Sequence, residues 1–520
     1  MVILGLQDLE RLKHTNMSVD STEKRNTDIQ VLPLEPEKEL KNVDQAFRYG
    51  LETECMVLDP LKEIKVVRKI DLFILPMMCI LMSCQLMDKS TNSYASIIGL
   101  RTDLKMTSQE YSWVGSSFYL GYLFFEYPAN MLLQRFPLSK TLGVAVVCWG
   151  VIMCCHGACQ LPSTFLLCRT LLGIFEAFMD PAYMLMTSQW YRKEEQYIRC
   201  GVWLGFQGFG TMLGSGIAYG FYENESSLSL APWRLLFILT GVITIFFGLV
   251  SLFHVPDIPT EAWFFNDEEK KYTVERIRRN RTGFGNKSFK FTQLKQASLD
   301  PCIYLFFIYM FAYGLTNGAL GNFGSIILND QFKFPTGQSL LLNMVGSGID
   351  IVFPLFFAYV NSLLIPSRLA TSFLIDSINY IGVCMLAFAP PKGAKLTGYF
   401  LTFLTTSSWA NMSSVVSSNV AGHTKKITAN TTFLIGFCVG NMVGPQAFIG
   451  SEAPTYPTAK RVMAGTYVLT LISEISLFFI YHFRNRRKDD YQAKDTLLDD
   501  AHLSFGDLTD LENLSFRYVL

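Results

Sequence analysis

The sequence predicts an all-α membrane protein with twelve transmembrane helices in two pseudo-symmetric bundles of six. Composition is the first observation: 50% of the residues are hydrophobic and only 17% are charged, whereas a soluble domain has roughly 25% charged residues. The second is a series of apolar runs long enough for membrane helices, which need about 20 residues each. The third is a charged linker that separates six runs from six more, an order typical of internally duplicated membrane folds.

Polar segments and apolar runs divide the chain into five expected parts. Residues 1–65 are polar and predict a cytoplasmic N-terminal tail without stable structure. The N-terminal bundle is expected over 66–254 and the C-terminal bundle over 301–483, with 255–300 as a cytoplasmic linker and 484–520 as a cytoplasmic C-terminal tail. The expected spans lie near residues 70–92, 110–132, 141–160, 163–187, 199–221, 233–254, 302–326, 338–360, 368–389, 396–418, 429–450 and 463–483.

Lysine and arginine in the short loops predict the orientation, because loops rich in them stay in the cytoplasm. With the N-terminus inside, the inner loops hold basic groups such as Arg192, Lys193 and the cluster over 484–488. The outer loops hold few, so both ends are expected in the cytoplasm. Asn224 opens an Asn-Glu-Ser sequon in an outer loop of this topology and is a candidate glycosylation site.

Charged residues interrupt the first and fourth spans. The stretch MDKSTNSYAS (87–96) brings Asp88 and Lys89 to the outer half of the first span. Arg169 lies about 9 Å inside the outer end of the fourth span, and Glu176 follows two turns later on the same helix face. Since buried charges in a membrane pair or face a cavity, we expect an Asp88–Arg169 or a Lys89–Glu176 contact if the two helices are neighbours.

Arg169, Glu176 and Asp180 form a polar stripe along the fourth span, and Pro181 is expected to bend the helix there. Two interpretations of the stripe remain open. It is either a structural salt-bridge network or an anion site beside a proton carrier. A guanidinium keeps its charge and binds a carboxylate through two parallel hydrogen bonds, whereas a carboxyl in a low-dielectric cavity can take up and release a proton near neutral pH.

Uncharged polar and aromatic residues within other spans are further candidates for substrate binding. Each of them either orients a small polar substrate or joins two helices by a hydrogen bond. The candidates are Trp203 and Gln207 in the glycine-rich fifth span, and Tyr313, Asn317, Trp409, Asn411 and Asn441 in the second half.

Several classes of function are disfavoured. The segment GFGNKS (283–288) lacks the GKS or GKT of a Walker A motif, so an ATP-driven pump is not expected. No nucleophilic triad or zinc motif occurs in the sequence, and we therefore expect neither an enzyme nor a cofactor or metal. A formal net charge of +0 gives no reason to expect nucleic-acid binding.

Six segments are distinctive in sequence. They are MDKSTNSYASIIGLRTDLKM (87–106), YSWVGSSFYLGYLF (111–124), RTLLGIFEA (169–177), WRLLFILTGVITIFFG (233–248), GNMVGPQAFI (440–449) and FGDLTDLENLSFRYVL (505–520). Through them the chain resembles the major facilitator superfamily, and within it the allantoate permease branch of the fungal anion:cation symporters. The resemblance covers nearly the whole chain beyond residue 65. The loop NMLLQRFPLSK (130–140) departs from the superfamily motif, since it lacks the usual Gly and Asp.

The resemblance implies proton-coupled uptake of small organic anions by alternating access, through a cavity lined by the first, fourth, seventh and tenth spans. Arg169, with Lys89, is then expected to attract the substrate carboxylate, and Glu176 or Asp88 to carry the proton. The candidates that the resemblance places on cavity-lining helices are Asp88, Lys89, Arg169, Glu176, Asn317 and Asn411.

The expected protein is a plasma-membrane importer of a carboxylate similar to allantoate or ureidosuccinate, with the endoplasmic reticulum as the alternative membrane. Its expected partners are the substrate anion, protons and the lipid bilayer. The acidic DLTDLE of the tail (507–512) is either a contact for sorting or ubiquitination machinery or a solvated end. The alternatives are a transporter-like nutrient sensor, a uniporter or exporter, and a sulfonate or vitamin carboxylate permease of the same fold.

Overall fold

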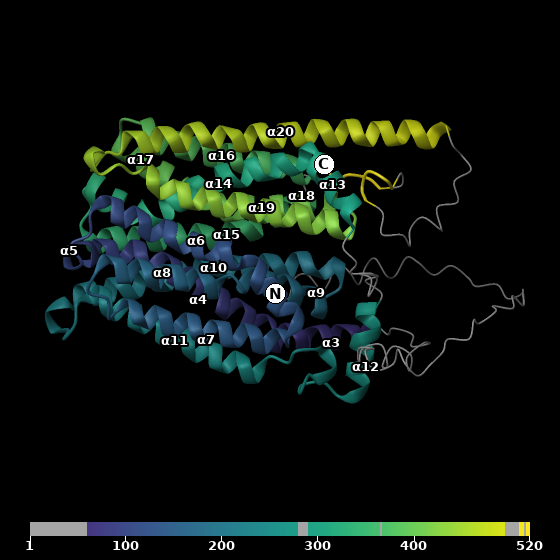
Figure 1. Ribbon diagram of the computed structural model, residues 1–520, viewed down its shortest axis with the longest axis horizontal. Coiled ribbons are helices and arrows are strands. Elements are labelled where there is room, and N and C mark those ends of the chain that lie inside the picture. The colour runs from purple at the N-terminus through teal and green to yellow at the C-terminus, as the bar shows by residue number, and fades with distance from the viewer. Residues whose placement is uncertain (1–59, 279–289, 364–366, 495–508, 514–515) are drawn as a thin grey trace, which may run out of the picture. The chain divides into compact units, whose positions relative to one another are not determined.

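The structure, a computed structural model, describes residues 60–278, 290–363, 367–494, 509–513 and 516–520. Most of the expected N-terminal tail, 1–65, lies outside these residues. The described residues form helices, turns and connecting segments without a strand. Figure 1 shows two bundles, one from α4 to α11 and the other from α14 to α20.

The N-terminal bundle follows the expected order of spans. Its helices are α3 (Pro60–Phe73), α4 (Leu75–Ile97), α5 (Leu100–Asp103), α6 (Ser108–Arg135), α7 (Leu138–His156), α8 (Pro162–Glu176), α9 (Met179–Trp190), α10 (Lys193–Glu223) and α11 (Pro232–His254). The short 3₁₀ helices η4 (Glu225–Ser227) and η5 (Pro259–Glu261) follow α10 and α11. The linker contains α12 (Asp267–Arg278) and α13 (Phe291–Leu299), two helices that the sequence analysis did not predict.

The C-terminal bundle repeats this order with one broken span. Its helices are α14 (Pro301–Ile326), α15 (Thr336–Leu363), α16 (Arg368–Phe388), α17 (Lys392–Leu401), α18 (Thr405–Asn419), α19 (His423–Val443) and α20 (Pro457–Lys494). A π-helical turn η6 (Ile327–Gln331) extends α14, and the 3₁₀ turn η7 (Thr402–Leu404) joins α17 to α18. The 3₁₀ turns η8 (Gly444–Ala447) and η9 (Gly450–Glu452) follow α19.

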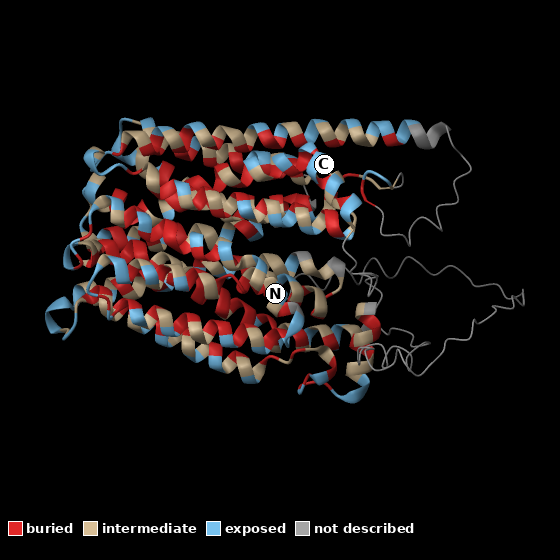
Figure 2. Cartoon of the chain, viewed as in Figure 1, coloured by how far each residue is buried: buried red, intermediate tan, exposed pale blue. Residues whose placement is uncertain are grey.

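Nine helical segments in the described residues are long and apolar enough to cross a membrane. Three less apolar segments, namely α6, α10 and α17 with α18, complete six spans in each bundle. Their polarity comes largely from buried residues such as Ser116 in α6, Ser215 in α10 and Ser408 in α18. Large apolar side chains such as Phe124 and Phe253 are exposed on the surface of the bundle, where lipid is their natural solvent. Figure 2 shows the buried residues gathered between the helices.

Local sequence explains where several helices begin. Thr107 and Glu110 form a capping box that starts α6. Asp300 accepts a hydrogen bond from the backbone N–H of Cys302 and, with Pro301 at the first helical position, starts α14.

Two features of the first and fourth spans concern the expected site. Helix α4 continues through 87–96 to Ile97, so Asp88 and Lys89 lie inside the helix and not at its end. The fourth span is interrupted after Glu176, between α8 and α9. The interruption lies where Pro181 was expected to bend the helix, because Pro181 has no N–H to donate to the carbonyl of residue 177.

The two bundles meet through hydrogen bonds near one end of the helices. We call the end that carries α3, α12 and α13 the linker end, and the end that carries α5 and α17 the far end (Figure 1). Near the far end, Asn92 donates to Asn322 at 3.0 Å, and Ser93 is hydrogen-bonded to Ser325 at 3.0 Å. Gln446 donates to Ser116 at 2.9 Å. Neutral polar groups therefore join the bundles at the far end, together with one partly exposed ion pair between Arg101 of α5 and Asp330 of η6 at 3.8 Å.

Candidate functional site

A cavity of about 240 Å³ lies between the two bundles. Helices α4, α6, α8, α9 and α10 line it from the N-terminal bundle, and α14, α15, α17, α18 and α19 line it from the other. The first, fourth, seventh and tenth spans thus all reach it, as the sequence resemblance implies. Close helix packing supports its wall, since a Cβ on Gly173 of α8 would lie 2.0 Å from the carbonyl oxygen of Phe118 in α6.

Lys89 and Glu176 form the ion pair that the sequence analysis put forward. The ammonium nitrogen of Lys89 lies 3.5 Å from a carboxylate oxygen of Glu176, whose side chain is fully buried. Lys89 lines the cavity, and its ammonium also lies 5.4 Å from the ring centroid of Phe118 and 5.8 Å from that of Tyr122. Such cation–π contacts help to hold a partly desolvated ammonium in place.

Arg169 lines the cavity with unused hydrogen-bond donors. Arg169 is 2% exposed, and its Nε and one terminal nitrogen, Nη2, are buried without a hydrogen-bond partner in the part of the chain that the structure describes. The guanidinium lies 5.6 Å from the ring of Phe165 and 5.4 Å from that of Phe237. Aromatic contacts hold the group, but they do not satisfy its N–H donors.

Asp88 does not form an ion pair within 4 Å of Arg169 in the described residues. It is fully buried and accepts a hydrogen bond from Thr244 of α11 at 3.0 Å. Of the two contacts that the sequence analysis weighed, the structure contains Lys89–Glu176.

Two further acids line the cavity from opposite bundles. Asp180 of α9 accepts a hydrogen bond from the Tyr122 hydroxyl at 2.7 Å. Asp350 of α15 accepts one from Thr406 at 2.9 Å. No role for Asp350 was predicted from the sequence. An acid within the apolar run LLLNMVGSGIDIVFPLF (340–356) nevertheless indicates a functional residue.

The uncharged candidates divide into two groups. Gln207, Tyr313, Asn317 and Trp409 line the cavity. The side chains of Trp203, Asn411 and Asn441 do not line it: Trp203 packs edge-on against Tyr183 at 5.2 Å, Asn411 donates to the carbonyl of Ser407, and Asn441 donates to that of Phe437.

Helix geometry explains this division. Asn411 follows Trp409 by two residues and therefore points to roughly the opposite side of α18. Asn441 lies where α19 crosses α14, since a Cβ on Gly318 would meet its backbone at 2.6 Å. Asn224 lies outside the cavity, exposed at the C-cap of α10, where its amide donates to the carbonyl of Gly220 at 2.9 Å.

Sequence comparisons identify the family. The model for the Major Facilitator Superfamily matches residues 78–445. The chain is 42% identical over 493 residues to a Schizosaccharomyces pombe protein described as an uncharacterized transporter, with 95% of this chain and 96% of that protein covered. It is 36% identical over 492 residues to the allantoate permease of Saccharomyces cerevisiae, with 92% and 90% covered.

A solved structure shows the same fold. The xylose transporter XylE from E. coli, in a partially occluded inward open conformation, matches with a TM-score of 0.58 and 15% identity, over 77% of this chain and 97% of that one. The family model covers well over half of the chain, and both relatives match nearly all of it. The chain therefore belongs to the Major Facilitator Superfamily and is a membrane transporter, not an enzyme.

Proposed function

We propose that this transporter imports a small organic anion together with a proton, by alternating access. The observation that carries the proposal is Arg169, a buried guanidinium that lines the cavity and has two nitrogens, Nε and Nη2, without a hydrogen-bond partner among the described residues. Buried donors are normally satisfied, and a guanidinium pairs best with a planar carboxylate. A substrate carboxylate at Arg169 would supply hydrogen-bond acceptors for these N–H groups.

The remaining cavity wall favours a small, polar substrate. A volume of about 240 Å³ is below the roughly 300–1,000 Å³ of sites for drug-sized ligands. Gln207 and Asn317 offer amide donors and acceptors, and Tyr313 and Trp409 offer aromatic surfaces. A carboxylate that also carries amide or urea groups fits this chemistry, and similarity to a permease for allantoate supports that substrate class.

Charge balance is the reason for including a proton. Asp88 and Glu176 balance the charges of Lys89 and Arg169, and Asp180 and Asp350 add two further carboxyl groups to the cavity wall. An incoming anion adds another negative charge to a region where an unbalanced charge is costly. A proton on Glu176 or Asp88 offsets the added charge. Protonation of Glu176 also weakens its pairing with Lys89, which frees the ammonium to attract the substrate.

Asp180 is a third proton-binding candidate, because it lines the cavity and, among the described residues, accepts a hydrogen bond from the neutral hydroxyl of Tyr122. The direction of access follows from the expected topology. With both tails in the cytoplasm, the far end faces outward, and the bonds Asn92–Asn322 and Ser93–Ser325 hold that side together. The described state is then an inward-facing one in the plasma membrane. Uptake requires these bonds to break and re-form in each cycle.

Uptake of labelled allantoate tests the proposal directly. The assay uses cells without their own permeases, at pH 5 and pH 7.5, with ureidosuccinate, a sulfonate and a vitamin carboxylate as competitors. Wild-type protein is expected to transport faster at pH 5. Arg169→Ala is expected to lose uptake. Arg169→Lys is expected to lose most of it, because an ammonium keeps the charge but lacks the two parallel N–H donors of a guanidinium. Amounts at the cell surface are measured for each variant.

Two results would contradict the proposal. Uptake that is independent of pH and brings no protons into the cell would exclude symport and leave a uniporter. Normal uptake by Arg169→Ala at normal surface amounts would remove Arg169 as the anion anchor. If a sulfonate or vitamin carboxylate competes while allantoate is not transported, the substrate class changes but the anion site stands.

A further inference from the structure

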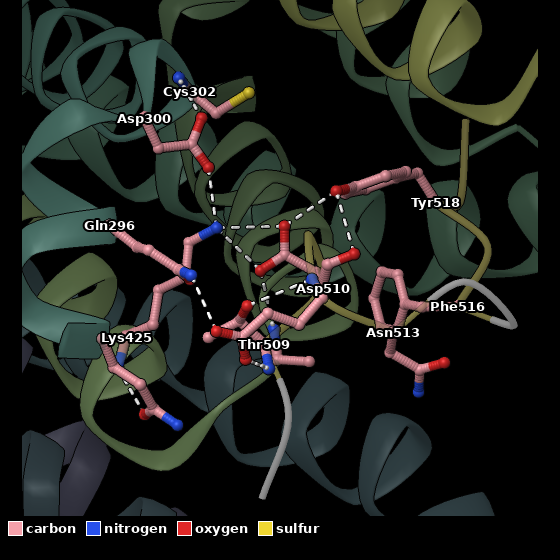
Figure 3. Close-up of polar contacts among 12 residues, drawn as sticks. Gln296, Asp300, Cys302, Lys425, Thr509, Asp510, Asn513, Phe516 and Tyr518 are labelled. Carbon is pink, nitrogen blue, oxygen red and sulfur yellow. Dashed lines mark hydrogen bonds and ion pairs between the residues drawn. The ribbon is translucent and has the colours of Figure 1, made fainter. Parts of the chain in front are cut away.

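The described residues of the C-terminal segment, 509–513 and 516–520, lie against the linker end of the C-terminal bundle and do not form a solvated tail. Figure 3 shows Asp510 of this segment between the side chains of Lys425 and Tyr518. The ammonium of Lys425 is fully buried and lies 2.8 Å from a carboxylate oxygen of Asp300 and 2.8 Å from one of Asp510. Asp300 is also paired with Arg484 at 2.7 Å. Asp510 is therefore the second anion of a buried ion cluster.

Main-chain groups of the segment are recognised as well. The ammonium of Lys488 donates to the backbone carbonyls of Asp510, Asn513 and Phe516. The ring of Tyr518 stacks on Tyr481 of α20 with centroids 4.9 Å apart, and its hydroxyl donates to Asp510 at 2.8 Å. The segment thus uses a carboxylate, several carbonyls and an aromatic ring to bind.

Two asparagine side chains hydrogen-bond to the backbone at the end of the segment. Each donates to a carbonyl and accepts from an N–H, as the edge strand of a sheet does with a bound peptide. The side-chain amide of Asn485 donates to the carbonyl of Tyr518 and accepts from its N–H, both at 2.9 Å. Asn419 forms the same two-way pair with Val519, at 2.9 and 2.7 Å. Such paired amide contacts recognise extended backbone irrespective of side chain, whereas the Asp510 and Tyr518 contacts supply sequence specificity.

The basic residues of the binding surface favour an acidic ligand. Lys425, Arg484 and Lys488 surround the segment, and the body of the bundle contributes Asp300 to the same cluster. Without Asp510, the buried Lys425 would keep one of its two carboxylates. Removal of one partner from a buried ion cluster is costly, because the other charge stays buried.

We propose that residues 509–520 are a detachable peptide ligand of their own chain, bound at a specific site formed by α14, α18, α19 and α20. The docked segment ties together the linker ends of helices that also line the cavity. Asp300, the N-cap of α14, reaches the segment through Lys425, and Asn419 is the last residue of α18. Docking therefore restrains two cavity-lining helices at the linker end. This second part rests on the proposed transport function.

The binding site is tested with the full chain. A site for a specific protease is inserted between residues 495 and 508, and the purified protein is cut after folding, so that every residue remains present. A fluorescent peptide with the sequence of 509–520 is then added, and its binding is followed by anisotropy. We expect saturable binding to the cut protein and none to the uncut protein, where the tethered segment holds the site.

Variant peptides test specificity without changing the folded protein. An Asp510→Asn peptide is expected to bind on the order of 100-fold more weakly, because it lacks the charge that pairs with Lys425. A Leu511→Ala peptide is the matched control: Leu511 is 40% exposed, and its peptide is expected to bind like the original. Absence of exchange on folded, cut protein, or equal binding of the Asp510→Asn peptide, would overturn the proposal.

Transport by full-length variants tests the second part. Asp510→Asn is expected to change the uptake rate several-fold at equal surface amounts, and Leu511→Ala to leave it unchanged. Unchanged uptake by Asp510→Asn would reject the effect on transport while the peptide site stands on the binding data. Because the binding assay contains no substrate, it also separates failure of this inference from failure of the proposed transport function.

Discussion

Lys89 and Glu176 show why charged residues persist inside a membrane bundle. The ammonium of Lys89 and the carboxylate of Glu176 lie 3.5 Å apart and pair with each other. Lys89 lines the cavity, whereas Glu176 lies buried behind it. Lys89→Met removes the ion-pair partner of the fully buried Glu176, so the folded state is expected to lose stability by about 3 kcal/mol. The double variant Lys89→Met with Glu176→Gln is expected to recover most of that loss, since no unpaired charge remains.

Thermal unfolding in detergent checks this prediction. The two single variants and the double variant form a double-mutant cycle whose coupling energy measures the pair directly. Additive effects would show that the ion pair contributes nothing to folding. Neither result depends on substrate, so the measurement separates the structural role of the pair from its proposed role in transport.

Asp300 gives a pH-dependent prediction outside the spans. Burial by itself raises the pKa of this carboxyl, but the hydrogen bond from Arg484 and the ammonium of Lys425 outweigh burial and lower the pKa to about 2. A lowered pKa means stability that is present above the usual value of about 3.9 and lost as the pH falls through about 2. Asp300→Asn is therefore expected to cost about 2 kcal/mol at pH 7 and less below pH 3.

The substitution to Asn isolates charge from helix capping, because Asn caps a helix about as well as Asp. Unfolding of both proteins is compared at pH 7 and pH 3, and the difference between them is the quantity of interest. A difference that stays constant between these pH values would show that the charge of Asp300 is not its source.

At the scale of helices, glycines determine how closely α6 and α8 approach. A Cβ on Gly173 would lie 2.0 Å from a backbone oxygen of α6, and neither backbone can move without disturbing the cavity wall. Gly173→Ala is expected to destabilise the protein by about 3 kcal/mol and to reduce uptake. Gly201→Ala in α10 is the control: a Cβ there meets nothing within 4 Å, so it is expected to be neutral or stabilising by about 0.5 kcal/mol. Unfolding curves decide between the two outcomes.

The sequence predicts the helices well, but it predicts less well which face of each helix lines the cavity. Lipid requires long apolar helices, so the spans are visible as apolar runs, and Pro181 marks the break between α8 and α9. The seven-residue spacing of Arg169 and Glu176 also predicts their shared face. The position of Trp203 off the cavity, in contrast, depends on how α10 is rotated against its neighbours, and no local pattern encodes that rotation.

Contacts between distant segments were the least predictable. Asp510 was expected in a tail that is either solvated or bound to other proteins, yet it pairs with Lys425, 85 residues away. Asp350 reaches the cavity because the second bundle brings α15 against α10. Both positions follow from tertiary packing, which composition and periodicity do not contain.

At the scale of the whole transporter, the far end and the linker end have different chemistry. Neutral amides and hydroxyls, together with one partly exposed ion pair between Arg101 and Asp330 at 3.8 Å, join the bundles at the far end, whereas a buried ion cluster holds the C-terminal segment at the linker end. Neutral hydrogen bonds contribute only about 1 kcal/mol each, so a few of them can break and re-form without a large barrier. The far end is thus suited to opening in every transport cycle.

A reversible crosslink at the far end tests this conclusion. The hydroxyl oxygens of Ser93 and Ser325 are 3.0 Å apart across the two bundles, and the sulfur of a cysteine takes the place of a serine oxygen, so cysteines at both positions are expected to form a disulfide in the described state. Alternating access requires these positions to separate, and uptake is therefore expected to fall at least tenfold on mild oxidation and to return after reduction. The single variants Ser93→Cys and Ser325→Cys control for the native cysteines. Full uptake with the crosslink formed would show that the far end stays closed while substrate passes, which alternating access of these two bundles does not permit.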